Sequence, residues 1–364
     1  MHPLNMLSPS LFSRKLIKWS LENPRNYPWI GEQNPYKIWI SEIILQQTRS
    51  EQGKSYYLNF IKKFPDIKTL ANASEDEVLQ AWEGLGYYTR ARNLHIAAKT
   101  INSTNNGQFP KNYETIKSLK GIGDYTAAAI SSFAYNLPYP VIDGNVIRVF
   151  SRILGIFTTI ETASGKKFFT EIANKYLHKS KAAIYNQAIM NFGAIQCKPQ
   201  NPLCETCIFL KTCFAYNNQQ IQNLPAKKKK IQIRKRFFHY FIIRNKKGEF
   251  ALQKRIKKDI WKHLYEPPML ETNKNISLNS IEKNKDFINL FESNNIVKFQ
   301  LVAKNKQKLS HQELFIKIYI PLIDKQVFKI KPGFSFVKPK NLVNFALPMS
   351  IGSFLEKFNQ NNIC

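Results

Sequence analysis

The first two thirds of the chain carry hydrophobic residues at three- and four-residue spacing, from residue 10 to about residue 213. This spacing places apolar side chains on one face of successive helices. Two helix starts are also marked. Asn34 stands before Pro35, a residue suited to the first helical position, and Ser74 precedes Glu77 by three residues, as in a capping box. The region is therefore predicted to be mainly α-helical.

The pattern changes after Pro225, because seven of the ten residues from Lys227 to Arg236 are positively charged. Such a run suits an exposed linker. Beyond it, residues 237–244 and 249–254 read as strands, and residues 245–248 (Asn-Lys-Lys-Gly) suit the turn between them. We expect a helical domain at 1–220, a basic linker at 221–236 and a smaller α/β domain at 237–364.

The composition is compatible with two domains, since 43% of the 364 residues are hydrophobic and can form two cores. No apolar run approaches twenty residues, and the start of the chain lacks the long apolar centre and cleavage site of a secretory signal. We therefore expect a cytoplasmic protein with no membrane partner, in a compartment where thiols stay reduced.

The charge is strongly positive, because 54 Lys and Arg residues stand against 25 Asp and Glu residues, a formal net charge of +29. The field of such a chain attracts polyanions. Nucleic acid is the partner that this field favours. The alternative is a lysine-rich surface that has no polyanionic partner.

Four cysteines lie close together in a loop at 197–213, with C-x6-C-x2-C-x5-C spacing: Cys197, Cys204, Cys207 and Cys213. Four thiolates without a nearby histidine suit an iron–sulfur cluster or tetrahedral zinc. Zinc sites usually pair two C-x2-C knuckles, and only one is present here. Buried or disulfide-bonded cysteines are a further alternative, which the polar and proline neighbours disfavour. The spacing indicates an iron–sulfur cluster.

Residues 119–129 read as a helix, a glycine hairpin and a second helix, within a helix-hairpin-helix at about 116–134. Gly121 and Gly123 would let the backbone approach a partner, and the amides that open the second helix would bind phosphate. Any tight helix–helix turn could carry the same glycines. Downstream, Asp143 stands within an apolar stretch, where it could cap a helix, act in catalysis, or do both.

Together, the hairpin, Asp143 and the cysteine loop resemble the iron–sulfur branch of the endonuclease III superfamily of DNA glycosylases. Residues 39–48 (WISEIILQQT) and 84–94 (GLGYYTRARNL) are similar to signatures of MutY-type adenine glycosylases. The resemblance implies a mainly α fold of two helical subdomains with a DNA cleft between them, one [4Fe-4S] cluster and a C-terminal MutT-like (Nudix-like) domain. It implies a monomer that excises adenine from duplex DNA, opposite 8-oxoguanine or guanine.

The chemistry of that reaction suits two carboxylates in different surroundings. The bond from adenine to deoxyribose breaks through an oxocarbenium-like sugar, which needs a proton donor for the base and a negative charge near the sugar. Glu42 has apolar neighbours in sequence and is the candidate general acid, because burial disfavours its ionised form. Asp143 is expected to remain ionised beside the sugar, with Asn145 holding it.

Tyr125 indicates the reaction subtype. Members of the superfamily that also cleave the strand carry a lysine at this position, and a phenol cannot form their Schiff base. The chain therefore reads as a monofunctional hydrolase, although Lys120 lies nearby. The alternatives are a lyase of endonuclease III type and a non-catalytic iron–sulfur protein that binds DNA.

The resemblance also implies residues that contact DNA. Gln47 and Tyr87 would fill the gap left by the flipped adenine, and core packing or simple exposure are the alternatives. In the second domain, Leu309, Ser310 and His311 align with a Phe-Ser-His loop that reads 8-oxoguanine in this family, with leucine in place of phenylalanine. No acidic magnesium-binding helix is evident there, so recognition is expected rather than nucleotide hydrolysis.

Overall fold

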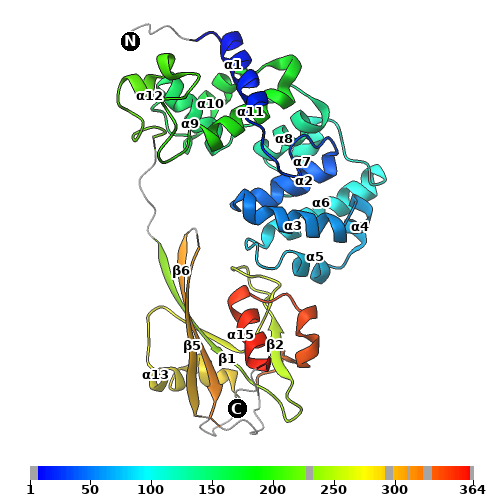
Figure 1. Ribbon diagram of the computed structural model, residues 1–364. Coiled ribbons are helices and arrows are strands. Elements are labelled where there is room, and N and C mark those ends of the chain that lie inside the picture. The colour runs from blue at the N-terminus through cyan, green and yellow to red at the C-terminus, as the bar shows by residue number, and fades with distance from the viewer. Residues whose placement is uncertain (1–6, 227–232, 292–297, 310, 323–329, 361–364) are drawn as a thin grey trace. The chain divides into compact units, whose positions relative to one another are not determined.

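The computed structural model describes the chain except for residues 1–6, 227–232, 292–297, 310, 323–329 and 361–364 (Figure 1). Contacts between Cα atoms divide the chain into two compact units. The first unit comprises Met1–Asn72 and Asn93–Lys229, and the second comprises Ala73–Arg92 and Lys230–Cys364. Each unit is described separately.

The first unit is helical, as predicted. Its α-helices are α1 (Pro9–Glu22), α2 (Pro35–Leu45), α3 (Ser50–Lys63), α4 (Ile67–Asn72), most of α6 (Thr89–Asn105), α7 (Tyr113–Ser118), α8 (Asp124–Tyr135), α9 (Gly144–Leu154), α10 (Ala163–Tyr176), α11 (Ala182–Ile195) and α12 (Phe214–Asn217). The predicted start of α2 is confirmed, because the Asn34 side chain accepts hydrogen bonds from the backbone N–H groups of Tyr36 and Lys37.

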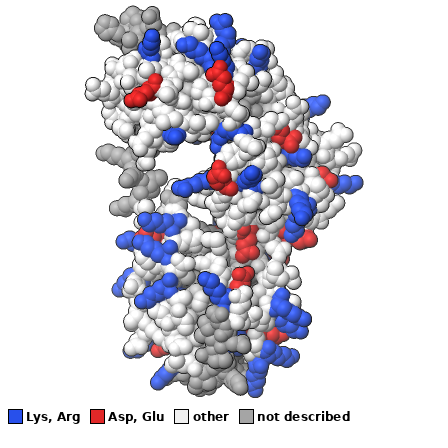
Figure 2. All heavy atoms as spheres, in the orientation of Figure 1, with Lys and Arg blue, Asp and Glu red and all other residues white. Residues whose placement is uncertain are grey.

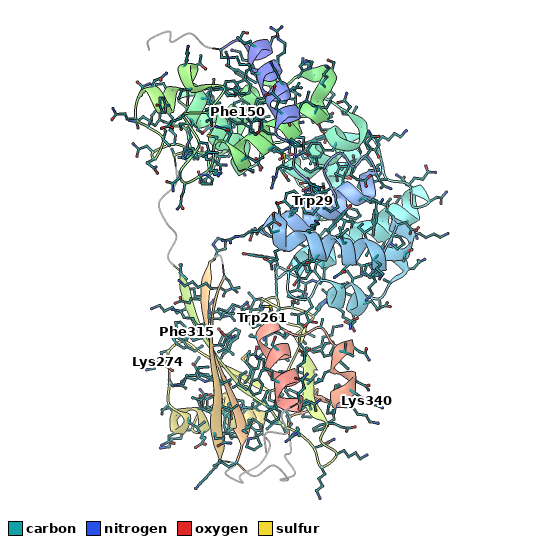
Figure 3. The ribbon with its side chains drawn as sticks, in the orientation of Figure 1. Trp29, Phe150, Trp261, Lys274, Phe315 and Lys340 are labelled. Carbon is teal, nitrogen blue, oxygen red and sulfur yellow. The ribbon has the colours of Figure 1, made fainter. Side chains whose placement is uncertain are left out.

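Two groups of helices make up this unit. Helix α1 packs against α10 and α11, and together with α9 they enclose an aromatic core around Phe12, Phe150 and Phe209. Phe150 is labelled in Figure 3. The rings of Phe12 and Phe209 are stacked with centroids 4.9 Å apart. In the other group, α2 packs against α3 and α8, and α7 against α8. Residues of both groups line a pocket.

The second unit contains two sheets and several short helices. Its strands are β1 (Arg234–Phe241), β2 (Phe250–Lys254), β3 (Tyr265–Glu266), β4 (Met269–Thr272), β5 (Phe299–Lys308), β6 (Gln312–Pro321) and β7 (Ser335–Val337). The larger sheet has the order β4-β1-β6-β5 and the smaller has the order β3-β2-β7. Its α-helices are α5 (Glu75–Ala81), α13 (Leu278–Glu282), α14 (Lys285–Leu290) and α15 (Met349–Gln360). The unit is therefore mixed α/β, as predicted.

The larger sheet buries both of its faces in part. One face joins β2 and α15 in a core that includes Phe238, Ile316 and Leu355. On the other face, Phe241 and Tyr319 pack with residues of α14 in a second core. Strand β1 runs parallel to β6 and antiparallel to β4, whereas β5 and β6 form an antiparallel hairpin.

Two boundaries differ from the sequence prediction. Strand β1 begins at Arg234, because residues 234–241 pair in parallel with β6, so the last three residues of the expected linker at 221–236 are strand. Residues 73–92, expected within the helical domain at 1–220, group with the second unit. The Lys254 ammonium contacts the Asp76 carboxylate at 2.7 Å in that unit. The capping box of Ser74 and Glu77 is confirmed.

The turn predicted at residues 245–248 is present, with Gly248 at a φ of 74° and its N–H donating to the carbonyl of Asn245. A positive φ is the conformation that glycine adopts without strain. Among the helices of the described residues, none has both the length and the apolar character that crossing a membrane requires.

Candidate active site

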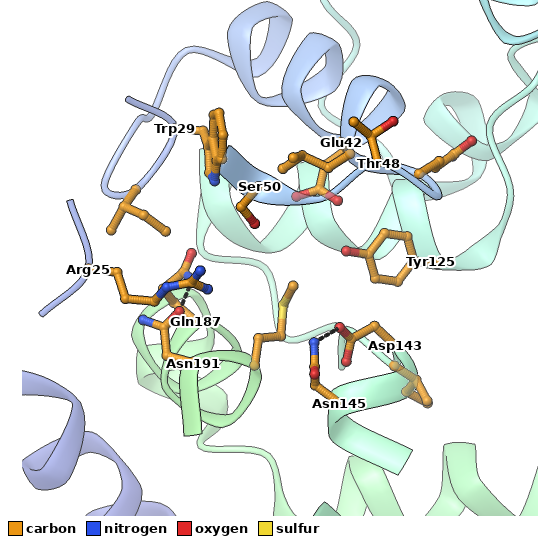
Figure 4. Close-up of a pocket in the computed structure, with 15 residues that line it drawn as sticks. Arg25, Trp29, Glu42, Thr48, Ser50, Tyr125, Asp143, Asn145, Gln187 and Asn191 are labelled. Atoms are coloured by element: carbon orange, nitrogen blue, oxygen red, sulfur yellow. Dashed lines mark hydrogen bonds between the residues drawn. The ribbon is translucent and has the colours of Figure 1, made fainter. Parts of the chain in front are cut away.

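A pocket of about 420 Å³ opens in the first unit where its two groups of helices meet (Figure 4). This volume is typical of a small-molecule site. The lining side chains come from the segment before α2, from α2, from the loop after it with the start of α3, from α8, from the start of α9 with the two residues before it, and from α11. They are Arg25, Trp29, Ile30, Glu42, Leu45, Gln46, Thr48, Ser50, Tyr125, Ile142, Asp143, Asn145, Gln187, Met190 and Asn191.

Glu42 lies on the wall of this pocket and is only 8% exposed, because α2 is apolar on both sides of it. Burial raises the pKa of Glu42 to about 7, and the negative charge of Asp143 also raises it. A hydrogen bond with Tyr125 acts in the opposite direction. The Tyr125 hydroxyl points toward the Glu42 carboxylate (Figure 4). Glu42 can therefore hold or release a proton near neutral pH.

Asp143 is held from several sides. It caps α9, since its Oδ1 accepts a hydrogen bond from the N–H of Val146 at 2.8 Å, and its Oδ2 accepts one from the Asn145 amide at 2.6 Å. Burial raises the pKa of Asp143, whereas these hydrogen bonds and the charge of Arg148 favour the carboxylate. The capping role therefore coexists with a place in the pocket.

The polar or aromatic pocket residues that the sequence did not single out include Arg25, Trp29, Gln187 and Asn191. Arg25 and Trp29 are joined by Tyr27, whose ring lies 4.7 Å from the guanidinium of Arg25 and stacks on Trp29 at 5.1 Å. On α11, the Gln187 amide donates to the side-chain oxygen of Asn191 at 3.1 Å. The only local sequence signal that could have identified any of these residues is the presence of an arginine and a tryptophan close together before α2.

The hairpin between α7 and α8 has the glycine geometry expected from the sequence. Gly121 has a φ of 83°, and a Cβ there would lie 2.6 Å from the Cβ of Asn93. Gly123 caps α8. At the first position of α8, the Asp124 carboxylate lies 2.6 Å from the Lys117 ammonium, so a phosphate at this helix start would meet both charges.

Gln47 and Tyr87, the expected wedge residues, share an unusual backbone. Their φ angles are 60° and 49°, in the left-handed region that residues other than glycine rarely occupy. Both side chains are exposed. Backbone conformations of this kind concentrate at functional sites. Gln47 belongs to the first unit and Tyr87 to the second.

The four cysteines line one largely apolar cavity next to α9 and α11, and all four are free thiols. These four residues form no disulfide with one another in the structure. Arg152 lies with its guanidinium 3.6 Å from the Cys197 sulfur, and the N–H of Phe209 donates to the Cys207 sulfur at 3.4 Å. Thiols that share a cavity and face N–H donors suit a metal centre that is bound through cysteine sulfurs.

No group of three or more His, Cys, Asp and Glu side chains in the described ranges is arranged to hold a metal ion. Helix α9 connects this loop to the pocket. The guanidinium of Arg148 donates to the carbonyl of Cys197 at 2.7 Å and to the side-chain oxygen of Asn145 at 2.8 Å.

In the second unit, the expected recognition loop lies at the turn between β5 and β6. Ser310 is outside the described residues. Leu309 packs partly against the core of the unit, and its N–H donates to the carbonyl of Gln312 at 2.8 Å. His311 is exposed. The leucine therefore has an apolar anchoring role at this turn.

Two family models match the chain. Residues 40–175 match the HhH-GPD superfamily of base excision DNA repair proteins, and residues 239–357 match the NUDIX domain. The first range contains Glu42, Tyr125 and Asp143, and the second contains the strands β2 to β7. The fold class expected from the sequence is confirmed for both regions.

Among solved structures, a thermostable thymine-DNA glycosylase matches with a TM-score of 0.54 and 27% identity, over 58% of this chain and 97% of that one. A non-covalent endonuclease III–DNA complex matches in fold with a TM-score of 0.50 and 21% identity, over 59% of this chain and 99% of that one. The adenine DNA glycosylase of Buchnera aphidicola subsp. Baizongia pistaciae is 35% identical over 366 residues, which cover 97% of this chain and 98% of that protein. This chain belongs to the adenine DNA glycosylase family.

Proposed function

We propose that this enzyme hydrolyses the N-glycosidic bond of adenine mispaired with 8-oxoguanine or guanine, as a monomer acting on duplex DNA in the cytoplasm. The observation that carries the proposal is the pocket in which Glu42, buried with a pKa of about 7, faces Tyr125 and shares the space with Asp143. An acid with such a pKa can donate a proton at neutral pH.

The flipped adenine enters the pocket and receives the Glu42 proton on a ring nitrogen as the bond to the sugar breaks. Asp143 stabilises the positive charge that develops on the sugar, or bonds to it before water attacks. Asn145 is a positioning residue, because its amide holds Asp143 Oδ2. Tyr125 holds Glu42 in place through a hydrogen bond.

Strand cleavage by a lyase step is not part of this proposal. Such a step needs an amine that attacks the sugar. Tyr125 lines the pocket, and no lysine is found among the described residues that line it. Lys120, the nearby amine noted in the sequence, is exposed. The reaction therefore ends at an abasic site.

The proposal assigns DNA contacts to three places. The hairpin at Gly121 and Gly123 holds a phosphate, and Gln47 and Tyr87 occupy the space of the flipped base. The exposed side chains and left-handed backbones of Gln47 and Tyr87 support the role assigned to these two residues. Ser310 and His311 read 8-oxoguanine, an assignment supported by the motif and by the exposure of His311.

We further propose that Cys197, Cys204, Cys207 and Cys213 hold one [4Fe-4S] cluster. The shared cavity and the N–H groups directed at two of the sulfurs support this assignment. When bound, such a cluster supplies iron–thiolate bonds that fix the loop. Protein purified without air is expected to contain about four irons per chain. Zinc in a 1:1 ratio without iron would reject the cluster.

The decisive experiment uses a duplex oligonucleotide with one adenine opposite 8-oxoguanine. Free adenine should appear, and the strand should break only after alkali or heat. A parallel duplex with adenine opposite thymine should release no adenine. Strand cleavage without alkali, trapped by borohydride, would indicate the lyase alternative, and absence of base release would indicate a non-catalytic protein.

A further inference from the structure

One face of the larger sheet in the second unit carries lysines and aromatic rings together. The register pairs Lys308 with Glu313, Lys306 with Phe315, and Lys304 with Lys317 across β5 and β6. It pairs Lys235 with Glu313 and Phe237 with Phe315 across β1 and β6. Paired residues lie on the same face of a sheet. The residues that we call the basic sheet face are Lys235, Phe237, Lys304, Lys306, Lys308, Glu313, Phe315 and Lys317.

The aromatic part of this face is accessible. The rings of Phe237 and Phe315 are stacked with centroids 4.8 Å apart and planes 14° apart. Both rings are partly exposed, whereas Phe238 and Ile316, which point to the other face, are buried. The Lys306 ammonium lies 5.1 Å from the centre of the Phe315 ring. Phe315 lies on the sheet in Figure 3. A flat apolar surface thus stands among cations.

The charges on this face are not balanced. Five lysines share this face with one carboxylate, and Lys235, Lys304, Lys306 and Lys308 are exposed. Hydrogen bonding and charge from Lys306, together with the charges of Lys308 and Lys235, lower the pKa of Glu313. Partial burial and the neighbouring charge of Lys304 lower the pKa of Lys317. Figure 2 shows Lys and Arg side chains gathered over β5 and β6. An anion would relieve this repulsion.

The spacing of the lysines along β5 suits a ligand with anionic groups at regular intervals. Lys304, Lys306 and Lys308 stand at alternate positions of β5, about 7 Å apart along the strand. They lead away from the turn that carries His311. A strand laid along β5 would meet lysines at regular intervals, and bases turned toward the sheet would meet Phe315 and Phe237.

We propose that the basic sheet face binds unpaired nucleotides of a DNA strand, with the bases stacked on Phe315 and Phe237 and the phosphates near the lysines. Aromatic rings on a sheet can stack only on bases whose faces are free, and duplex bases are covered by their neighbours. An acidic protein would use the lysines but would not need two accessible, parallel rings. This binding is separate from adenine excision.

The test measures binding of a fluorescent oligodeoxythymidine of twenty nucleotides to the full chain by anisotropy at several salt concentrations. Lys304→Ala/Lys308→Ala should weaken binding at least fivefold and reduce the slope of log K against log salt by about 1.4, since each phosphate contact on a single strand contributes about 0.7. The matched control is Lys338→Ala/Lys340→Ala, which removes two exposed charges elsewhere in the unit and should change neither quantity.

A separate variant, Phe315→Leu, tests the stacking of bases on the aromatic rings. Phe315→Leu keeps an apolar side chain, so it should weaken binding roughly fivefold at an unchanged salt slope, because a stacked base loses its ring. The same variant should bind a fully paired duplex like wild type. Thermal unfolding verifies that each variant is folded.

Two results would overturn the proposal. One is equal affinity and salt slope for the lysine variant and its control. The other is a loss of polyglutamate binding without a loss of oligonucleotide binding, which would assign the face to an acidic protein. Because the probe contains no adenine, the measurement stands whether or not the proposed excision is observed. Excision at saturating enzyme should be unchanged in all three variants.

Discussion

Carboxylates of the two units differ in their surroundings. In the second unit, the Arg236 guanidinium holds Asp259 and Glu271 with hydrogen bonds of 2.6 to 2.8 Å. Hydrogen bonds from Arg236 keep the pKa of Asp259 below its usual range. In the first unit, burial raises the pKa of both Glu42 and Asp143. In the second unit, a buried guanidinium balances the charge of two carboxylates that are 30% exposed. In the pocket, burial disfavours the charged form of both carboxylates.

The partner of each carboxylate decides whether it can donate a proton. A carboxylate bonded to a guanidinium stays ionised and cannot act as a proton donor at neutral pH. Glu42 faces a phenol and a second carboxylate instead, so its proton is retained until about pH 7. The two sites show how one kind of side chain serves structure or catalysis according to its partner.

The largest effect is expected from Glu42→Gln, which keeps the shape of the side chain and removes the acidic proton. Adenine release under single-turnover conditions should fall by about 10³-fold, within the range that a general acid contributes. Duplex binding measured by anisotropy should persist, which separates lost chemistry from lost folding. Near-normal excision would remove Glu42 from the mechanism.

Arg236→Met tests the structural role of the ion pairs in the second unit. Arg236 is buried and bonded to two carboxylates that are 30% exposed, so loss of these hydrogen bonds should lower the free energy of unfolding by about 2 kcal/mol. Arg234→Met is the matched control, because its guanidinium is 68% exposed and lies 3.9 Å from Glu271. That variant should lose less than about 1 kcal/mol in denaturant unfolding. Equal losses would refute the structural role of Arg236.

The pH dependence of stability gives a further test at Glu42. Its folded-state pKa of about 7 lies above the ordinary value of 4.5, so the folded state is penalised as pH rises between these values. Glu42→Gln lacks this penalty. Relative to wild type, it should therefore gain stability between pH 5 and pH 8, by up to about 3 kcal/mol. Parallel stability curves over that range would show that Glu42 ionises without cost.

The smallest effect is expected from Tyr125→Phe. The hydrogen bond from Tyr125 lowers the pKa of Glu42, so its removal should raise that pKa further. The excision rate should then decline at higher pH than in wild type, and the maximal rate should fall only a few-fold as Glu42 loses orientation. A single-turnover pH–rate profile measures both changes. A profile that moves to lower pH would contradict the assigned hydrogen bond.

Local signals predicted those parts of the fold that depend on neighbouring residues. Asn34 caps α2, Ser74 opens a capping box and Asp143 caps α9, each through bonds within a few positions. Burial of Glu42 also followed from its apolar neighbours in sequence. These features depend on residues that lie within a few positions of one another, so they can be predicted without the whole fold.

Features set by distant segments could not be predicted in this way. Arg25 and Gln187 line one pocket although more than half of the helical unit separates them in sequence. The start of β1 inside a charged run depends on parallel pairing with β6, far along the chain. The grouping of Ala73–Arg92 with the second unit likewise rests on contacts with later residues, such as Lys254.

The packing of α1 has a consequence for synthesis of the protein. Phe12 stacks on Phe209, so its partner is made long after α1 leaves the ribosome. The 197 positions between them take roughly 10–40 s at about 5–20 residues per second. During that interval the core around Phe12, Leu16 and Trp19 is incomplete on the nascent chain, and incompletely covered apolar surface is the kind that chaperones protect.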